Sequence, residues 1–142
     1  MDQSIQRAVV PEHRRMAVVH HTFGLSWSLF IEPLIFFQAD TLASDYNGGL
    51  WTFYTLTAPE DGTGFYMAPD IDADFDVVCV ENQWEGRLSA DALGITCCLT
   101  AYSNLSFSKN KALASLMAQH YHRLREYMFE HPEVQAILGA TD

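Results

Sequence analysis

The sequence predicts an α+β fold in which a single compact domain holds N-terminal helices, a small antiparallel β-sheet of about three to four strands, and C-terminal helices. Three observations predict it. The chain has 142 residues, the size of one domain, and 49% of them are apolar. Both ends of the chain have the apolar spacing of helices, whereas residues 51–80 combine aromatic and β-branched residues between turn signals. No repeat, low-complexity tract or linker divides residues 1–142.

The N-terminal part is expected to be helical after a loose arm at residues 1–10. Pro11 and Glu12 favour a helix start, because proline lacks only an amide hydrogen that would be unpaired there. This helix is expected to run to about residue 23, where Gly24 stops it. Residues 25–42 are apolar and also predicted to be helical, with Pro33 breaking or restarting the helix.

The middle of the chain carries the predicted sheet. Asn47 and Gly48 form a turn signal, and further turns are expected at residues 60–64 and 82–86. Pro69 closes the second strand. The segments that combine the residue types typical of strands are residues 51–56, 65–68 and 77–80.

Helices are predicted again from Ser89, which is a good N-cap. The first helix has two apolar stripes, which is typical of a central, buried helix. These stripes contain Leu93, Cys97, Ala101 and Leu105, and Ile95, Leu99 and Tyr102. A second helix, at about residues 112–131, has one apolar stripe. Pro132 and Glu133 then open a short terminal helix with Val134, Ile137 and Leu138 facing inward.

The distribution of charge excludes a nucleic-acid-binding surface over half of the chain. The formal net charge is −10, from 18 acidic and 8 basic residues. Residues 16–86 contain eleven acids and no lysine or arginine, so this segment carries −11 and the remainder +1. Because proteins neutralise phosphates with lysine and arginine, we expect no direct binding to nucleic acid.

Composition also indicates the compartment. No span is long and apolar enough to cross a membrane, and the N-terminus lacks the pattern of a secretory signal. The three cysteines, with Cys97 next to Cys98, give no disulfide framework. We therefore expect a cytoplasmic protein without membrane contact.

An acidic run at residues 70–81, DIDADFDVVCVE, resembles a calcium-binding loop at first sight. Its first, third, fifth and twelfth positions are acidic, as an EF-hand requires. The sixth position, however, is Phe75 where the loop needs glycine, and strand surrounds the segment instead of helix. The run is therefore a near miss, and no metal site is predicted.

Two other interpretations of the acidic run stay open. In the first, Asp70, Asp72, Asp74 and Asp76 are simply the solvated face of an approach to a strand, with the residues between them turned inward. In the second, the four aspartates form a docking surface about 20 Å long, since same-face residues of an extended chain are about 6.6 Å apart. Such a row could imitate DNA phosphates.

Signals for catalysis or cofactors are weak. His120 and His122 point to different faces of a helix, and no acid or cysteine with zinc spacing accompanies His13 and His20. The sequence has no glycine-rich phosphate loop or nucleophile motif. Asp91 is expected to stabilise a helix N-terminus through the helix dipole. We predict a protein that is not an enzyme and has no cofactor.

Five blocks of sequence, in order, resemble the ArdB/KlcA family of antirestriction proteins. They cover nearly the whole chain from about residue 9. The blocks are VPEHRRM (10–16), YNGGLWTFY (46–54), GFYMAP (64–69), LSADALGI (88–95), and YHRLREY with the following HPE (121–133). The resemblance implies a small protein of a plasmid, phage or genomic island that blunts type I restriction–modification enzymes, with no catalytic residues or cofactor known to transfer.

We therefore expect a non-enzymatic inhibitor that contacts the type I restriction–modification enzyme or an associated host DNA-processing protein. The alternatives are an acidic DNA mimic that uses residues 70–76 and, third, a small enzyme of unknown type. A monomer or weak homodimer is expected. Trp51 has two interpretations, an exposed contact residue or a strand aromatic packed on the core. The second is favoured. The candidate contact residues are Asp70, Asp72, Asp74, Asp76, Glu81, Glu85, Tyr46, Trp51 and Asp142.

Overall fold

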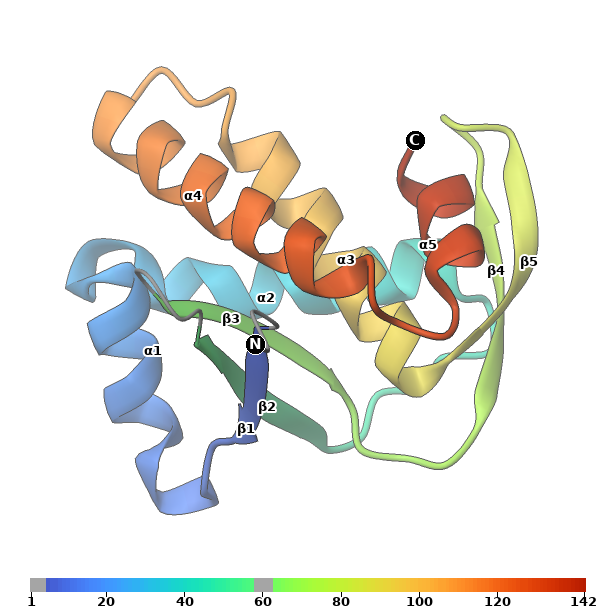
Figure 1. Cartoon of the computed structure of the whole chain (residues 1–142), viewed down its shortest axis with the longest axis horizontal. Coiled ribbons are helices and arrows are strands. Elements are labelled where there is room, and N and C mark those ends of the chain that lie inside the picture. The colour runs from blue at the N-terminus through green and yellow to red at the C-terminus, as the bar shows by residue number, and fades with distance from the viewer. Residues whose placement is uncertain (1–4, 58–62) are drawn as a thin grey trace, which may run out of the picture.

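A computed structural model describes residues 5–57 and 63–142. Helices and strands surround one hydrophobic core, which confirms the α+β prediction (Figure 1). The strands form two antiparallel sheets, ordered β1–β2–β3 and β4–β5, where we expected one. The elements are β1 (Gln6–Val9), η1 (Glu12–Arg14), α1 (Arg15–Phe23), α2 (Leu25–Leu42), β2 (Trp51–Thr57), β3 (Thr63–Pro69), β4 (Asp74–Cys79), β5 (Trp84–Ser89), α3 (Ala90–Leu105), α4 (Lys111–Met128) and α5 (Val134–Thr141).

The prediction of a loose arm at residues 1–10 is wrong for residues 6–9. Residues 6–9 form β1, which pairs with β2 in an antiparallel register that sets Gln6 opposite Thr57 and Val9 opposite Tyr54. All four residues of β1 are exposed, so this edge strand lacks the alternation that would reveal it in the sequence. Residues 1–4 lie outside the described residues, as does most of the predicted turn at residues 60–64.

Gly24 separates the first two long helices, as predicted. Its φ of 81° is in the region that favours glycine, and its N–H donates to the His20 carbonyl. Pro33, however, does not break α2, which runs through it. Pro33 is exposed, and its missing N–H removes one helical hydrogen bond while the buried side of α2 stays packed.

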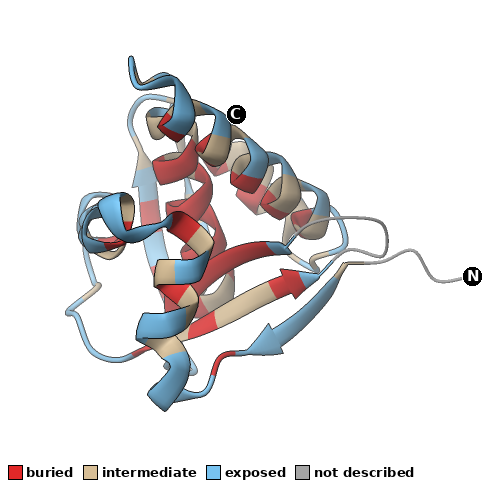
Figure 2. Ribbon diagram, turned by 90° about the vertical axis from the view of Figure 1, so that its left-hand side faces the viewer, coloured by how far each residue is buried: buried red, intermediate tan, exposed pale blue. Residues whose placement is uncertain are grey.

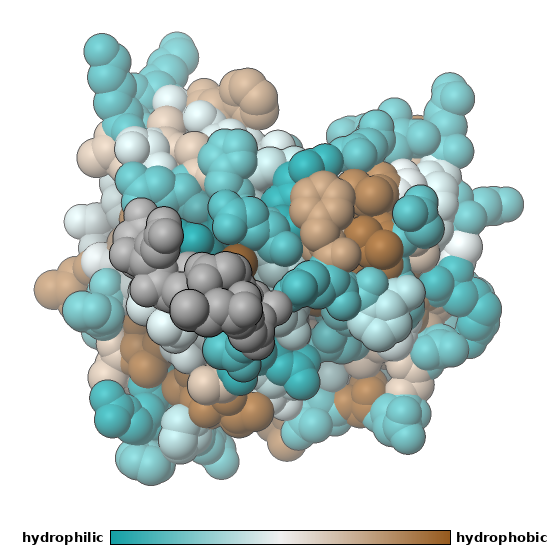
Figure 3. Space-filling view, viewed as in Figure 1, coloured by the Kyte–Doolittle hydropathy of each residue, from teal (hydrophilic) through white to brown (hydrophobic). Residues whose placement is uncertain are grey.

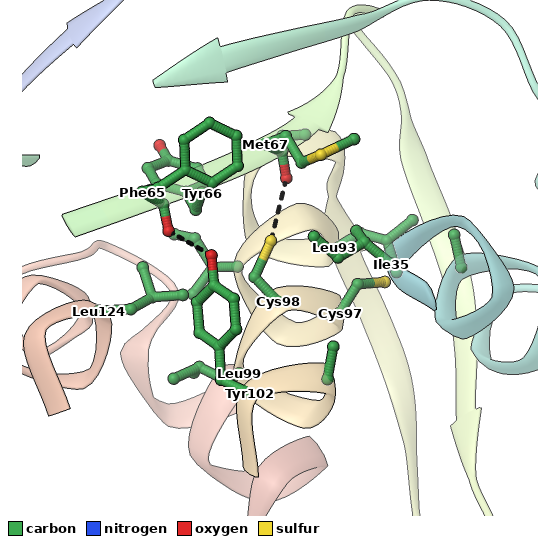
Figure 4. Close-up of a cluster of buried hydrophobic side chains, with 14 of the residues drawn as sticks. Ile35, Phe65, Tyr66, Met67, Leu93, Cys97, Cys98, Leu99, Tyr102 and Leu124 are labelled. Carbon is green, nitrogen blue, oxygen red and sulfur yellow. Dashed lines mark hydrogen bonds between the residues drawn. The ribbon is translucent and has the colours of Figure 1, made fainter. Parts of the chain in front are cut away.

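Helix α3 is the central element of the core, which confirms the prediction from its two apolar stripes. It packs against α2, α4, α5 and β3, and most of its residues are buried (Figure 2). Ser89 caps it, since its Oγ accepts the Ala92 N–H at 3.1 Å. Figure 4 shows Tyr102 donating to the Phe65 carbonyl of β3 at 2.7 Å.

The hairpin of β4 and β5 lies beside α5 and α3 (Figure 1). Strand β4 starts at Asp74, three residues before the predicted strand, and β5 occupies most of the predicted turn. A bridge between Ala43 and Val77 connects the hairpin to the end of α2. The hairpin therefore begins in the middle of the acidic run, at Asp74.

Candidate functional site

The acidic run is bent, so the predicted 20 Å row is wrong. Asp70 and Asp72 lie in a bend before β4, and only Asp74 and Asp76 belong to the strand. Phe75 and Val77 point into the core, so both strand aspartates point to solvent. The four carboxylates are exposed, but they do not form one straight line.

The outer face of the hairpin gathers further charge around these aspartates. Asp76 lies opposite Arg87 and Val78 opposite Glu85, and directly paired residues share a face. Arg87 Nη1 donates to Asp76 Oδ1 at 2.6 Å, so one cation partly neutralises the group. The Asp45 carboxylate accepts the Asp76 N–H at 3.3 Å and adds a negative charge. We call the exposed carboxylates of Asp45, Asp70, Asp72, Asp74, Asp76 and Glu85 the acidic surface.

Glu81 lies apart from the acidic surface, at the far end of the hairpin. It is exposed and lines a cavity of about 130 Å³ beside Tyr121 of α4 and Thr141 of α5. Asn82 closes one side of this cavity by donating to the Ala140 carbonyl at 2.6 Å. Asp142, at the end of α5, is exposed and lies 3.7 Å from Arg125 Nη2.

The aromatic turn around Tyr46 and Trp51 is not an exposed contact surface. Trp51 is 3% exposed and packs on Phe36 with ring centroids 5.1 Å apart, as the core reading predicts. Its Nε1 donates to the Tyr46 hydroxyl at 2.9 Å. Tyr46 is half-buried, and burial raises its pKa. Trp51 therefore fills the core beside the turn, and we no longer count it among the candidate contact residues.

A second polar group, absent from the predictions, surrounds Asp91 at the start of α3. Arg7 of β1, Tyr66 of β3 and His131 all contact this carboxylate, and we call the four residues the Asp91 network. Oδ1 accepts from the Tyr66 hydroxyl at 2.8 Å and from Arg7 at 3.2 Å, whereas Oδ2 lies 2.9 Å from His131 Nε2. Arg7 also donates to the Tyr66 hydroxyl at 2.9 Å.

The electrostatics of the Asp91 network favour an ionised, fixed carboxylate. Burial opposes ionisation of Asp91, but the hydrogen bonds from His131 and Tyr66 and the charge of Arg7 outweigh it and lower its pKa. Burial raises the pKa of Tyr66, so its hydroxyl keeps the proton that it donates. Asp91 does lie at a helix N-terminus, as predicted, but its distant partners are invisible in the sequence.

Neither nitrogen of His131 is free to act as a base. Its Nδ1 accepts the Glu133 N–H at 3.0 Å, so in the neutral ring the proton is on Nε2 and faces Asp91. Glu133 in turn accepts from the N–H and hydroxyl of Ser89. The network therefore fastens β1, β3, α3 and the start of α5 together, and its geometry is that of a structural cluster.

The described part of the chain offers little for a cofactor. Within residues 5–57 and 63–142, no three His, Cys, Asp or Glu side chains are grouped as metal ligands. Cys97 and Cys98 are fully buried, and burial raises the pKa of both thiols, that of Cys98 to about 12. None of the helices in these ranges is long and apolar enough to cross a membrane.

Comparison with known proteins finds a family and several relatives that this chain resembles. The model of a family described as antirestriction protein matches residues 44–142. The chain is 37% identical over 137 residues to the uncharacterized protein YafX of Escherichia coli K12, covering 94% of this chain and 85% of YafX. It is 34% identical over 142 residues to an Escherichia coli antirestriction protein, KlcA, covering 99% and 97% of the two chains.

A solved structure extends the likeness to the whole fold. It superposes with a TM-score of 0.87 at 34% identity, over 100% of this chain and 98% of the other. The description of this solved structure states that the KlcA and ArdB proteins show a novel fold and antirestriction activity against type I DNA restriction systems in vivo but not in vitro. The chain therefore belongs to the antirestriction protein family that includes KlcA and ArdB.

Proposed function

We propose that this protein protects incoming DNA from type I restriction in the cell, without enzymatic activity, through contacts with a protein. The contacted protein is a type I restriction–modification enzyme or a host DNA-processing protein that works with it. The observation that carries the proposal is the full-length match to a structure whose proteins act against type I systems in vivo.

The surface that we propose for this contact is the acidic surface. It is exposed, it lies on the β4–β5 hairpin and the segments beside its start, and it belongs to the part of the chain without lysine or arginine up to Gly86. Such a surface suits a basic patch on another protein, because opposite potentials steer and orient the encounter. The occupied nitrogens of His131 support a role without catalysis.

A DNA mimic is the second candidate, and the geometry supports it less. Imitation of a phosphate backbone needs carboxylates in a regular line, whereas two of the four aspartates lie in a bend and Arg87 pairs with a third. The activity described for KlcA and ArdB in vivo but not in vitro also favours a contact that needs the cell. A mimic should inhibit a purified restriction enzyme directly.

The test of the function compares the plating of unmodified phage on cells with a type I system, with and without this protein. We expect the protein to raise plating. The variant Asp70→Asn, Asp72→Asn, Asp74→Asn and Asp76→Asn should lose most of this protection, because it removes four charges from the acidic surface. Glu12→Gln with Glu126→Gln, two exposed acids elsewhere, is the matched control and should protect normally.

Each component of the proposal has its own contrary result. Unchanged plating by the wild-type protein would refute the antirestriction function. Full protection by the fourfold asparagine variant would show that the acidic surface is not needed for the antirestriction function. Salt-sensitive inhibition of a purified type I enzyme that DNA relieves by competition would establish the mimic instead.

A further inference from the structure

A pocket between the first two long helices holds a cation and an acid that do not pair with each other. Its volume is about 380 Å³, which is within the range of small-molecule sites. Its lining comes from η1, α1, α2 and β2, and together we call these residues the α1–α2 pocket: Glu12, Arg15, Met16, Val19, His20, Ser28, Leu29, Glu32 and Phe53.

The α1–α2 pocket combines apolar walls with a few polar groups. Helix α1 stands at the left in Figure 1, and α2 crosses the back of the molecule. In Figure 3, drawn from the same side, apolar and hydrophilic atoms are mixed on the left of the molecule. Within the pocket, Val19 and Phe53 are buried, whereas Met16 and Leu29 are 74% and 75% exposed. Small-molecule sites have this composition.

Arg15 is the cation of the pocket, and its burial is poorly compensated. Its guanidinium carbon lies 4.8 Å from the centroid of the Phe53 ring, and this cation–π contact holds it in place. Its Nε is buried, yet no hydrogen-bond partner for this atom lies in the part of the chain that the structure describes. A buried donor without an acceptor costs free energy. An acceptor brought to the half-buried guanidinium would offset part of this cost.

Glu32 of α2 is the acid that lines the same pocket. It is half-buried, and burial raises its pKa, while the positive charge of Arg15 acts in the opposite direction. Within residues 5–57 and 63–142, the two residues form no ion pair. They are thus close enough to interact through their charges but too far apart to pair, so a ligand between them can contact both.

Ser28 adds a polar group on the Glu32 side of the pocket. The two residues are four positions apart and therefore share one side of α2. Ser28 is 4% exposed, and its hydroxyl donates to the Leu25 carbonyl at 3.4 Å, so its oxygen can still accept a hydrogen bond. Ionised Glu32 and Ser28 thus offer acceptors, whereas Arg15 offers only donors. A complementary ligand carries an acceptor and a cationic donor close together.

A ligand with a single charge satisfies only one side of the pocket. An anion would meet Arg15 but would also lie beside Glu12 and Glu32, in a chain with a net charge of −10. A cation would leave Arg15 without an acceptor. A zwitterion supplies both charges and adds no net charge. The α-amino acids are small zwitterions of this kind, with a carboxylate and an ammonium group on one carbon.

We infer that the α1–α2 pocket binds a free α-amino acid with an apolar side chain. The carboxylate accepts from Arg15, and the ammonium group donates to Glu32 and Ser28. The side chain contacts the apolar wall of Met16 and Leu29. A peptide fits poorly, because its two charged ends are on different residues. The inference concerns a ligand site and does not depend on which protein the acidic surface contacts.

Isothermal titration calorimetry of the full chain with leucine tests the inference. We expect saturable binding at micromolar to millimolar concentrations of leucine. Two probes each lack one charge: 4-methylpentanoate is leucine without the ammonium group, and isopentylamine is leucine without the carboxylate. Each probe should bind about tenfold or more weakly than leucine, because hydrogen bonds to a charged group are lost.

Two variants assign the charges of the ligand to residues. Arg15→Gln and Glu32→Gln should each weaken leucine binding by about tenfold or more. The advantage of leucine over 4-methylpentanoate should shrink in Glu32→Gln, and its advantage over isopentylamine should shrink in Arg15→Gln, because each variant lacks the partner of the missing charge. Arg14→Gln, at an exposed arginine outside the pocket lining, is the matched control and should bind leucine normally.

Thermal unfolding is the second measurement. Millimolar leucine should raise the melting temperature of the wild type and of Arg14→Gln, but should raise that of the two pocket variants less, because only a bound ligand stabilises the folded state. Circular dichroism checks that each variant is folded.

Several results would overturn the inference. The wild type could fail to bind leucine, or both pocket variants could bind it as tightly as the wild type does. Binding of 4-methylpentanoate as tight as that of leucine would mean a site for simple anions. Equally tight binding of isopentylamine would mean a site for simple cations.

Discussion

Asp91 joins distant segments of the chain through one carboxylate. Its two oxygens contact Arg7, Tyr66 and His131, which come from β1, β3 and the connection between α4 and α5. Arg7 also lies 4.5 Å from the centroid of the Tyr54 ring, and the Tyr54 and Tyr66 rings stack at 4.7 Å. The side chains around Asp91 thus add cation–π and stacking contacts to its hydrogen bonds.

Asp91→Asn should destabilise the protein at neutral pH by about 1 to 3 kcal/mol, because hydrogen bonds to a charged group are lost. The pKa of Asp91 is lowered on folding, so its stabilising effect is present above about pH 4 and is lost as the pH falls below that value. Urea unfolding at several pH values measures this. The wild type and Asp91→Asn should converge in acid, and Asp72→Asn, at an exposed site, should match the wild type throughout.

His120 is a second residue that is expected to make the stability of the protein depend on pH. It is 5% exposed, packs on Phe23 and Tyr102, and its Nδ1 has no hydrogen-bond partner within the described residues. Burial is the main cause that lowers its pKa, to about 4. The unfolded chain therefore binds a proton at this histidine below about pH 6.5, while the folded protein does not.

We expect His120 to lower the free energy of unfolding by up to about 3 kcal/mol between pH 6.5 and pH 4. His120→Gln should flatten the dependence on pH in this window, because glutamine does not titrate. His122→Gln, at an exposed position of the same helix, should keep the wild-type dependence. Equal slopes for the two variants would show that His120 is protonated in the folded protein.

Close contact between α3 and β3 organises the fold at the level of elements. Gly94 makes it possible, since a Cβ at this position would overlap the Met67 carbonyl oxygen and Ala68. Both of these neighbours are buried and belong to β3. A side chain at position 94 would therefore push the central helix away from the sheet.

Gly94→Ala should destabilise the protein by about 2 kcal/mol or more, through overpacking against a backbone that cannot move aside. Gly139→Ala is the comparison, because its Cβ would meet the half-buried side chain of Trp84, which can shift. Thermal unfolding should show a clearly larger loss for Gly94→Ala. Similar melting temperatures would mean that α3 can move on β3 without cost.

Elements with a strong internal pattern could be predicted from the sequence. Helices α3 and α4 have long apolar stripes. Local chemistry marks two helix boundaries, since Gly24 ends α1 and Ser89 caps the start of α3. Strand β1 could not be predicted, because its pairing with β2 depends on residues about 50 positions away. The same holds for the Asp91 network, whose contacts span 25 to 84 positions, and for the bend that divides the acidic run.

At the scale of the whole molecule, charge is distributed unevenly. The acidic surface lies on and beside the β4–β5 hairpin, while most basic residues follow Gly86. Of these bases, Arg87, Arg123 and Arg125 lie within 4 Å of carboxylates. Electrostatic attraction to another molecule is therefore expected mainly where that molecule is positive.

This distribution predicts that the purified protein does not bind duplex DNA at physiological ionic strength, because few free cations are available to release counterions. Fluorescence anisotropy with a labelled duplex measures it. A variant with Asp74→Lys and Asp76→Lys serves as a control with less negative charge and should bind more strongly at low salt. Tight, sequence-independent binding of the wild type would contradict the expectation.

Strand β1 has a practical consequence for any shortened form of the protein. Among the described strands it pairs with β2 alone, and it shields the outer N–H and C=O groups of β2 from solvent. Removal of residues 1–9 would turn β2 into an open edge and take Arg7 from Tyr66 at the same time. N-terminal truncation is therefore expected to promote aggregation through strand addition between molecules, even though the four residues of β1 are themselves exposed.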